Sequence, residues 1–285
     1  MSNLIIYKHN ELIENFIFNA TETELQILNL AVAKTNPTWH QKNLVYRITV
    51  AEIASTYKTK SHNNYKLYSD ALNRLMKRTY SFYRDNKETK VTENVIVRIA
   101  ENEVEKWFEF RFNEYISERI SKLKGLFTKY NIKNIAMFKS RYAFILYDSF
   151  CMRINQLPDG VHVYRQKISI SDFKENLDLT GKYKRFDDLQ KKVLNVAKSN
   201  ISEHSNIRFS YEVIKTGRAP THIKFTAQLK NPSKDPSIKN QTEIPDLDAS
   251  RSSHNFTEPT GEQIAKRKAD LKQILNTKWQ TPHGQ

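Results

Sequence analysis

The chain has 285 residues and a formal net charge of +15, and 39% of its residues are hydrophobic. This length suggests two domains, and the excess of positive charge predicts a polyanionic partner, with nucleic acid favoured over an anionic membrane surface. No run approaches ~18 consecutive apolar residues and the amino terminus lacks a signal-peptide core, so membrane-spanning and secreted classes are excluded and a cytoplasmic protein is expected.

The first part of the chain has the pattern of one small unit of helices and strands. Thr21 and Glu24 have the spacing of a capping box, and they open a helix predicted over residues 21–34. After this helix the pattern predicts a strand at 44–50, a brief helix at 51–57, a longer helix at 65–83, and strands at 91–100 and 107–112.

The next part of the chain repeats this order of elements. It is predicted to contain a helix at 139–155, a strand at 166–170, a short helix at 171–177, a longer helix at 183–201, and strands at 207–214 and 222–229. A shift of 120 positions aligns residues 47–53 with 167–173, each pair alike in character, and a shift of 118 aligns Tyr65 and Lys66 with Tyr183 and Lys184. The chain therefore contains two copies of one fold.

Strand, short helix, longer helix and hairpin form the order of a winged helix-turn-helix, in which the longer helix reads DNA and the hairpin is the wing. We expect an α+β protein with two tandem winged-helix domains, at 1–125 and 126–230. Residues 231–285 are rich in Pro, Ser and charge, which predicts a mostly disordered tail with a possible short helix at 261–275.

The longer helix of the second unit has an apolar face and a cationic face. At ~100° per residue, Phe186, Leu189, Val193 and Ala197 gather on one side, with Leu194 at its edge. The opposite side is cationic, and residues 126–230 hold 19 Lys and Arg against 9 Asp and Glu. The predicted DNA-binding residues of this unit are Lys182, Lys184, Arg185, Lys191, Lys192, Asn195 and Lys198, with Lys215 and Arg218 at the tip of the wing.

Two interpretations of these cations stay open on the residues alone. An ordinary surface helix can carry solvated lysines, and the wing tip can be a charged hairpin in water. Asp188 has Lys191 and Lys192 three and four residues on, so a local ion pair is favoured over a base contact. Gln190 projects toward the buried side and is not counted among the DNA-binding residues.

The first unit differs from the second in the charge of its hairpin. Its longer helix also offers predicted DNA contacts, which are Lys66, Asn73, Arg74, Lys77 and Arg78. Its hairpin tip instead carries Glu101, Glu103 and Glu105, which would repel phosphate. We therefore predict that these three residues and Trp107 form a protein interface, most simply with another copy of the chain.

Residues 168–225 resemble the Rep3-type replication initiators of iteron-containing plasmids. The resemblance is carried by the ISISDF step, by the spacing of Tyr183, Phe186, Leu189, Leu194, Ala197 and Ile201, and by FSYEVIKTGRAPTHIKF with Lys215, Gly217 and Arg218. Where members often carry an arginine cluster, this chain has Gln190, Lys191 and Lys192.

The resemblance implies binding of direct repeats at a plasmid origin as a monomer, and dimerisation through the first domain with repression of the initiator's own promoter. It also implies contacts with a host initiator, helicase and chaperones. The residues predict no enzyme, cofactor or metal site, because the chain lacks a nickase-like His pair and a GxxxxGK[ST] loop. A transcriptional regulator without a replication role is the alternative.

Overall fold

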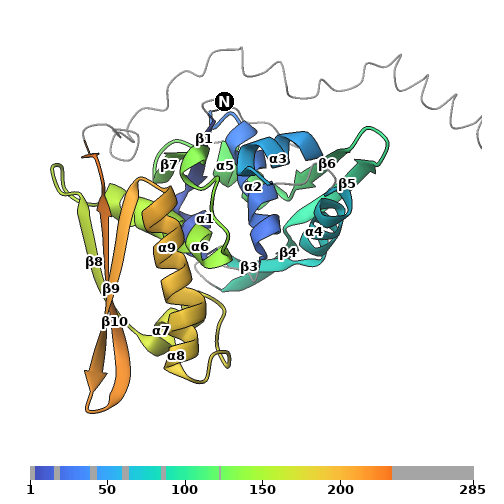
Figure 1. Ribbon diagram of the computed structural model, residues 1–285. Coiled ribbons are helices and arrows are strands. Elements are labelled where there is room, and N and C mark those ends of the chain that lie inside the picture. Colours follow the sequence, from blue (N-terminus) through green and yellow to red (C-terminus); the bar gives the residue numbers. More distant parts are fainter. Residues whose placement is uncertain are drawn as a thin grey trace, which may run out of the picture.

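The computed structural model describes residues 4–15, 20–38, 44–59, 64–84, 88–121 and 123–232. The tail predicted from residue 231, with its helix at 261–275, lies almost wholly outside these ranges. Within them the chain is a mixed α+β protein with two winged-helix units in tandem, as predicted (Figure 1).

The helices of the first unit begin at local capping signals. Its described helices and first sheet strand are α1 (Asn10–Asn15), α2 (Glu22–Lys34), β2 (Val45–Thr49), α3 (Val50–Tyr57) and α4 (Tyr65–Lys77). The capping box predicted before α2 is confirmed, because Thr21 and Glu24 each accept the other's backbone N–H. Thr49 and Glu52 form a second capping box that starts α3.

The strands of the first unit form two separate sheets. They are β3 (Thr79–Arg84), β4 (Thr89–Asn94), β5 (Ile96–Asn102) and β6 (Trp107–Phe112). Strands β2, β6 and β5 lie side by side in that order as the wing sheet, while β3 and β4 pair as an extra hairpin. The strand predicted over 91–100 is therefore two strands, which meet at Val95 and belong to different sheets.

The helix predicted over 65–83 is wrong in its last turns. It ends at Lys77, and Arg78 has an extended backbone with φ −80° and ψ 134°. The residues after it alternate polar and aromatic side chains, which suits a strand, and pairing with β4 provides the backbone hydrogen bonds that a helix would have made.

A short antiparallel pair joins the start of the chain to the segment between the two winged units. β1 (Ile5–His9) pairs with β7 (Phe127–Asn131), and α5 (Glu114–Ser121), η1 (Ile132–Asn134) and α6 (Arg141–Asn155) flank β7 in the chain. The domain limit predicted at residue 125 falls between α5 and β7, and β7 returns to pair with the first strand of the chain. That limit stays a prediction.

The second unit repeats the element order of the first. It contains β8 (Val163–Ser169), α7 (Ile170–Asn176), α8 (Phe186–Leu189), η2 (Gln190–Leu194), α9 (Asn195–His204), β9 (Ile207–Thr216) and β10 (Ala219–Leu229). Strand β10 is central, with β8 on one side and β9 on the other. The order of elements predicted for this unit is confirmed.

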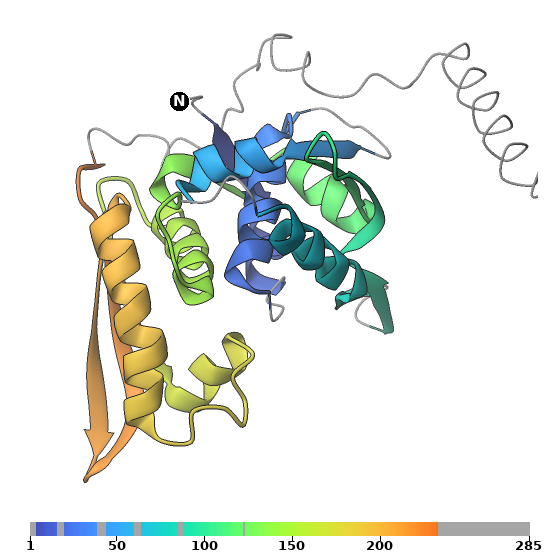
Figure 2. The ribbon, with the colours of Figure 1, turned by 45° about the vertical axis from the view of Figure 1, so that its right-hand side comes forward.

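Helix α6 joins the cores of the two units. Tyr147 packs edge-on against Tyr130 of β7, with ring centroids 5.1 Å apart. One turn along, Phe150 faces Phe209 of β9 at 4.8 Å and Phe225 of β10 at 6.2 Å. Each buried aromatic ring of this kind contributes about 1.5–3 kcal/mol through removal from water. In Figure 2, α6 lies between α2 and α9, so one helix fixes the second winged unit against the first.

Candidate nucleic-acid interface

The second reader helix is formed by α8, η2 and α9, which follow one another without a break from residue 186 to residue 204. The start predicted at residue 183 is wrong, because Tyr183 has φ 50°, a left-handed conformation outside the α-helical region. Arg185 is the N-cap residue. Lys184 and Arg185 therefore lie in the turn before the helix, not on its face.

A π turn interrupts this helix at its centre. The backbone N–H of Asn195 donates to the carbonyl oxygen of Gln190, five residues back, and the turn contains Lys191 and Lys192. The wider turn brings Leu194 fully into the core, where a regular helix places it at the edge of the apolar face. Single π turns inside helices occur frequently at functional sites, because they change which side chains share a face.

The cations predicted around this helix all expose their side chains. They are Lys182, Lys184, Arg185, Lys191, Lys192 and Lys198, and Asn195 is exposed with them. The local ion pair predicted for Asp188 is present, with its Oδ1 3.8 Å from Nζ of Lys192. Arg185 lies 3.4 Å from Asp187. Such exposed pairs are worth at most about 1 kcal/mol and can exchange for phosphate. Their role in DNA contact stays a prediction.

Asn195 is held by a residue of the wing. The hydroxyl of Tyr211, on β9, donates to the Oδ1 atom of Asn195. The side-chain amide is thereby oriented, and its Nδ2 protons remain as donors toward solvent. A base edge that offers an acceptor, such as guanine O6 or N7 or thymine O4, is the chemical match for this group. The sequence alone gives no sign of this bond.

The basic turn before the helix is held in place by residues of α6 and α7. The hydroxyls of Tyr183 and Tyr142 lie 3.1 Å apart, and the ammonium of Lys174 donates to the carbonyl oxygen of Tyr183 at 2.8 Å. Burial, together with the Tyr183 hydroxyl, raises the pKa of Tyr142 to about 12. The Tyr142 phenol therefore stays neutral at physiological pH, and its contact with Tyr183 ties the turn that carries Lys182 and Lys184 to helix α6.

The wing of the second unit presents cations at its tip. Strands β9 and β10 meet at Thr216 and Ala219, and Gly217 takes the positive φ of 61° that the tight turn requires. Lys215 and Arg218 are exposed on either side of it. The reader helix and this tip belong to one rigid unit, because α9 packs directly on β9.

In the first reader helix, α4, two of the predicted DNA-binding residues pair with a buried carboxylate. The Nε atoms of Arg74 and Arg78 each lie 2.8 Å from the carboxylate of Glu24, whose side chain is 0% exposed. Arg78 is the C-cap residue and Arg74 lies in the last turn of the helix. The remaining predicted contacts Lys66, Asn73 and Lys77 are exposed, and Asn73 also donates to the carbonyl oxygen of Ser69. DNA contact by α4 stays a prediction.

The hairpin between β5 and β6, hereafter the acidic hairpin (101–107), has an ordered tip. Glu101 accepts a hydrogen bond from the Tyr65 hydroxyl at 3.2 Å, and Glu105 accepts one from the Trp107 indole at 2.5 Å. Val104 is 91% exposed between them. Two cations flank the tip without covering it, since Arg47 stacks on the Trp107 ring and Lys106 lies over the Tyr65 ring.

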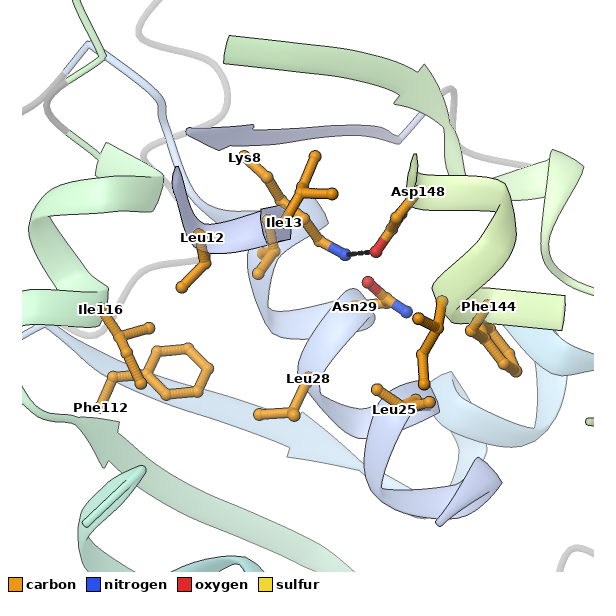
Figure 3. Close-up of a pocket in the computed structure, with 12 residues that line it drawn as sticks. Lys8, Leu12, Ile13, Leu25, Leu28, Asn29, Phe112, Ile116, Phe144 and Asp148 are labelled. Carbon is orange, nitrogen blue, oxygen red and sulfur yellow. Dashed lines mark hydrogen bonds and ion pairs between the residues drawn. The ribbon is translucent and has the colours of Figure 1, made fainter. Parts of the chain in front are cut away.

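An apolar cavity of about 70 Å³ lies away from these surfaces, between α1, α2, α5 and α6 (Figure 3). The charged side chains that line it, Lys8 and Asp148, pair with each other at 2.6 Å. The Tyr130 hydroxyl donates to the second oxygen of Asp148. Because these charges satisfy each other, we regard the cavity as a packing feature of the first unit.

Three further observations concern the residues that the structure describes. Among these residues, no group of three or more His, Cys, Asp or Glu side chains is placed to hold a metal ion. No helix within the described ranges is long and apolar enough to span a bilayer. Cys151 is a free cysteine that is fully buried in the core.

Two tandem winged-helix units, one of them with a cationic helix beside a cationic wing, define a DNA-binding protein of the winged-helix class. The chain belongs to the initiator replication protein family. The first domain of that family, described as "Initiator Replication protein, WH1", matches residues 5–151, and the second, "Initiator Rep protein, WH2", matches residues 169–227. The family resemblance seen in the sequence is therefore confirmed, and the protein is a DNA-binding replication initiator.

A solved structure has the same fold. The crystal structure of the Pi initiator protein in complex with iteron DNA has 20% sequence identity and a TM-score of 0.66, and the similarity covers 81% of this chain and 99% of that chain. Domains 2 and 3 of RctB have 11% identity and a TM-score of 0.45, over 76% of this chain and 82% of theirs.

Proposed function

We propose that this protein initiates replication of a plasmid by binding direct repeats, or iterons, at its origin. The observation that carries the proposal is the second reader helix, whose exposed cations and oriented Asn195 lie beside a cationic wing in a chain of the initiator family. The Pi initiator, which shares the fold, was crystallised in complex with iteron DNA.

The two domains have different tasks in this proposal. The second domain supplies the main contact, with lysines on phosphate and Asn195 on a base edge. The first adds an auxiliary contact through Lys66 and Lys77, which are exposed on α4. The protein binds repeats as a monomer and, as a dimer, represses its own promoter. Contacts with a host initiator, helicase and chaperones belong to the same proposal.

Self-association is assigned to the acidic hairpin. The carboxylates of Glu101, Glu103 and Glu105 suit a protein partner, and Trp107 lies at the base of the same hairpin. Replacing the three glutamates with glutamine is expected to weaken self-association and to leave DNA affinity within a factor of about two. Intact self-association together with stronger DNA binding would overturn this assignment.

Fluorescence anisotropy with the DNA that flanks the coding region tests the main proposal. Tight binding to a fragment with tandem direct repeats is expected, with specific affinity falling steeply as salt rises. In parallel, the same fragment should sustain a plasmid in cells only when the protein is supplied. Binding without plasmid maintenance would favour the alternative, a transcriptional regulator, and equal binding to random DNA would refute specific recognition.

A further inference from the structure

The second unit has a basic surface that faces away from its reader helix. The inner face of the β8–β10–β9 sheet packs on α6, α7 and α9, and Figure 1 shows α9 on one side of the sheet with no described element on the other. On that outer side the strands carry Arg165 and Lys167 from β8, Arg208 from β9 and Lys224 from β10. We call these four residues the outer sheet face.

The charges of the outer sheet face are poorly compensated within the fold. Lys224 lies directly opposite Lys167 in the sheet register, an arrangement of like charges that destabilises a sheet. Lys224 finds its counter-ion on the other neighbouring strand, with Nζ 3.3 Å from Glu212. Arg165 and Arg208 are opposite neutral residues, so both arginines and Lys167 are exposed without an acidic cross-strand partner. A surface of this kind suits an acidic partner.

The acidic hairpin of the same chain has the opposite charge to the outer sheet face. Its tip is held in place before any partner binds, because the backbone N–H of Glu105 donates to Asn102 at 2.9 Å while Tyr65 and Trp107 fix Glu101 and Glu105. Carboxylates that are already ordered lose little conformational freedom on docking.

Symmetry decides which surface the hairpin meets. A two-fold contact of hairpin with hairpin would set the three glutamates of one copy against the three of the other, which is repulsive. Direct repeats orient bound copies alike, so a contact between neighbours must join two different surfaces. In the proposed function the reader helix and wing tip contact DNA, which leaves the outer sheet face as the cationic surface of this unit that a protein can meet.

From this geometry we infer that the acidic hairpin of one copy docks on the outer sheet face of the copy bound to the next repeat. The inference rests on the proposed function and adds to it the partner surface of the hairpin. Binding to one repeat then strengthens binding to its neighbour, because two copies on adjacent repeats are held close together and the contact adds to the binding of both.

The test compares DNA carrying one repeat with DNA carrying two direct repeats, using fluorescence anisotropy on the full-length chain. The native protein is expected to bind the second repeat about fivefold or more tightly when the first is occupied, a common size of coupling between sites. The two charge-reversed variants are Glu101→Lys with Glu103→Lys and Glu105→Lys, and Arg165→Glu with Lys167→Glu and Arg208→Glu. Each should abolish the coupling, and one chain carrying both sets should regain it.

A matched control changes the same amount of charge elsewhere. Lys90→Glu with Lys124→Glu and Lys133→Glu alters three exposed residues outside both surfaces, and the coupling should survive. Moving the second repeat by about 5 base pairs, half a helical turn, should also remove the coupling for the native chain. Coupling that is unaffected by either charge reversal, or that is absent from the native chain, overturns the inference.

Binding to DNA with a single repeat distinguishes a failure of the docking contact from a failure of the proposed function. If the native chain binds one repeat tightly and the reversals do not change the coupling, the docking contact is wrong and the proposed function stands. If the native chain binds no repeat, the proposed function fails, and sedimentation at low salt then decides the contact without DNA. An equimolar mixture of the two reversed variants should associate while each alone does not, and association of each alone would refute the contact.

Discussion

Replacing Glu24 with glutamine tests a buried carboxylate that pairs with two arginines. The carboxylate is 0% exposed, and it accepts hydrogen bonds from Arg74 at 2.8 Å, from Arg78 at 2.8 Å and from the backbone N–H of Thr21 at 3.0 Å. Glutamine keeps the size of the side chain and the capping box. The substitution removes the negative charge between two guanidinium groups, and it replaces one of the two acceptor oxygens by an NH2 donor.

The expected loss of unfolding free energy follows from the burial of the Glu24 carboxylate. Removing one partner of a buried ion pair costs ~3–5 kcal/mol of unfolding free energy. Because Arg74 is 44% exposed and Arg78 is 23% exposed, both guanidinium groups can regain some water, which favours the lower end, about 3 kcal/mol. For a protein of this size that corresponds to a fall in Tm of roughly 6–12 °C.

Urea unfolding followed by circular dichroism measures the effect. Glu22→Gln is the matched control, since Glu22 lies in the first turn of the same helix and its carboxylate accepts a hydrogen bond from the neutral Gln26. Its unfolding free energy should change by less than about 1 kcal/mol. A double-mutant cycle of Glu24→Gln with Arg74→Ala should show strong coupling. An unchanged midpoint for Glu24→Gln, or strict additivity in the cycle, would refute the reasoning.

Three further outcomes are expected. Lys191→Ala with Lys192→Ala should weaken repeat binding and lower the slope of log K against log salt by roughly one unit for each lysine that no longer neutralises a phosphate, and an unchanged slope would place the reader elsewhere. Tyr211→Phe should free the amide of Asn195 and reduce affinity for the true repeat by about 1 kcal/mol with little change on random DNA, whereas an equal reduction on both would argue against base reading. Burial by itself would raise the pKa of Glu52, but the hydrogen bonds from Lys34 and Thr49 outweigh it and lower that pKa below 4.5. The stability from this carboxylate is therefore fully present above pH 4.5 and disappears as the pH falls through the lowered pKa, so the gap in urea midpoint between the native chain and Glu52→Gln should close in acid.

Local signals in the sequence were enough to place most helices. The capping box at Thr21 and the apolar repeat after it predicted α2, because both depend on residues within a few positions of each other. The strand pair β3–β4 was missed, since Thr79–Arg84 is extended only in the company of a partner strand, and the strand's aromatic residues also fit a helix. Likewise β1 and β7 are short and more than a hundred residues apart in the sequence, so no local pattern predicts their pairing.

In the candidate interface, too, local features could be predicted from the sequence and contacts between elements could not. Projection onto a helix predicted that Lys191, Lys192 and Asn195 are exposed, because exposure on a helix follows from the position of its apolar face. The π turn at Gln190–Leu194 was not predicted, since hydrophobic spacing does not distinguish a turn of four residues from one of five when Val193 and Leu194 are both apolar. The bond from Tyr211 to Asn195 joins two elements and depends on their packing.

The two reader helices differ in how firmly their cations are held, and this difference separates their roles. For Arg74 or Arg78 to leave Glu24 for a phosphate, a buried carboxylate must give up its partner, at a cost of about 3 kcal/mol or more. The exposed ion pair that the arginine would then form with a phosphate contributes at most about 1 kcal/mol. The Arg74 guanidinium can therefore reach DNA only with the Nη atoms that its Nε contact with Glu24 leaves outward. In the second reader helix, Lys192 leaves only an exposed Asp188 when it moves, so its ammonium can pass to a phosphate at little cost.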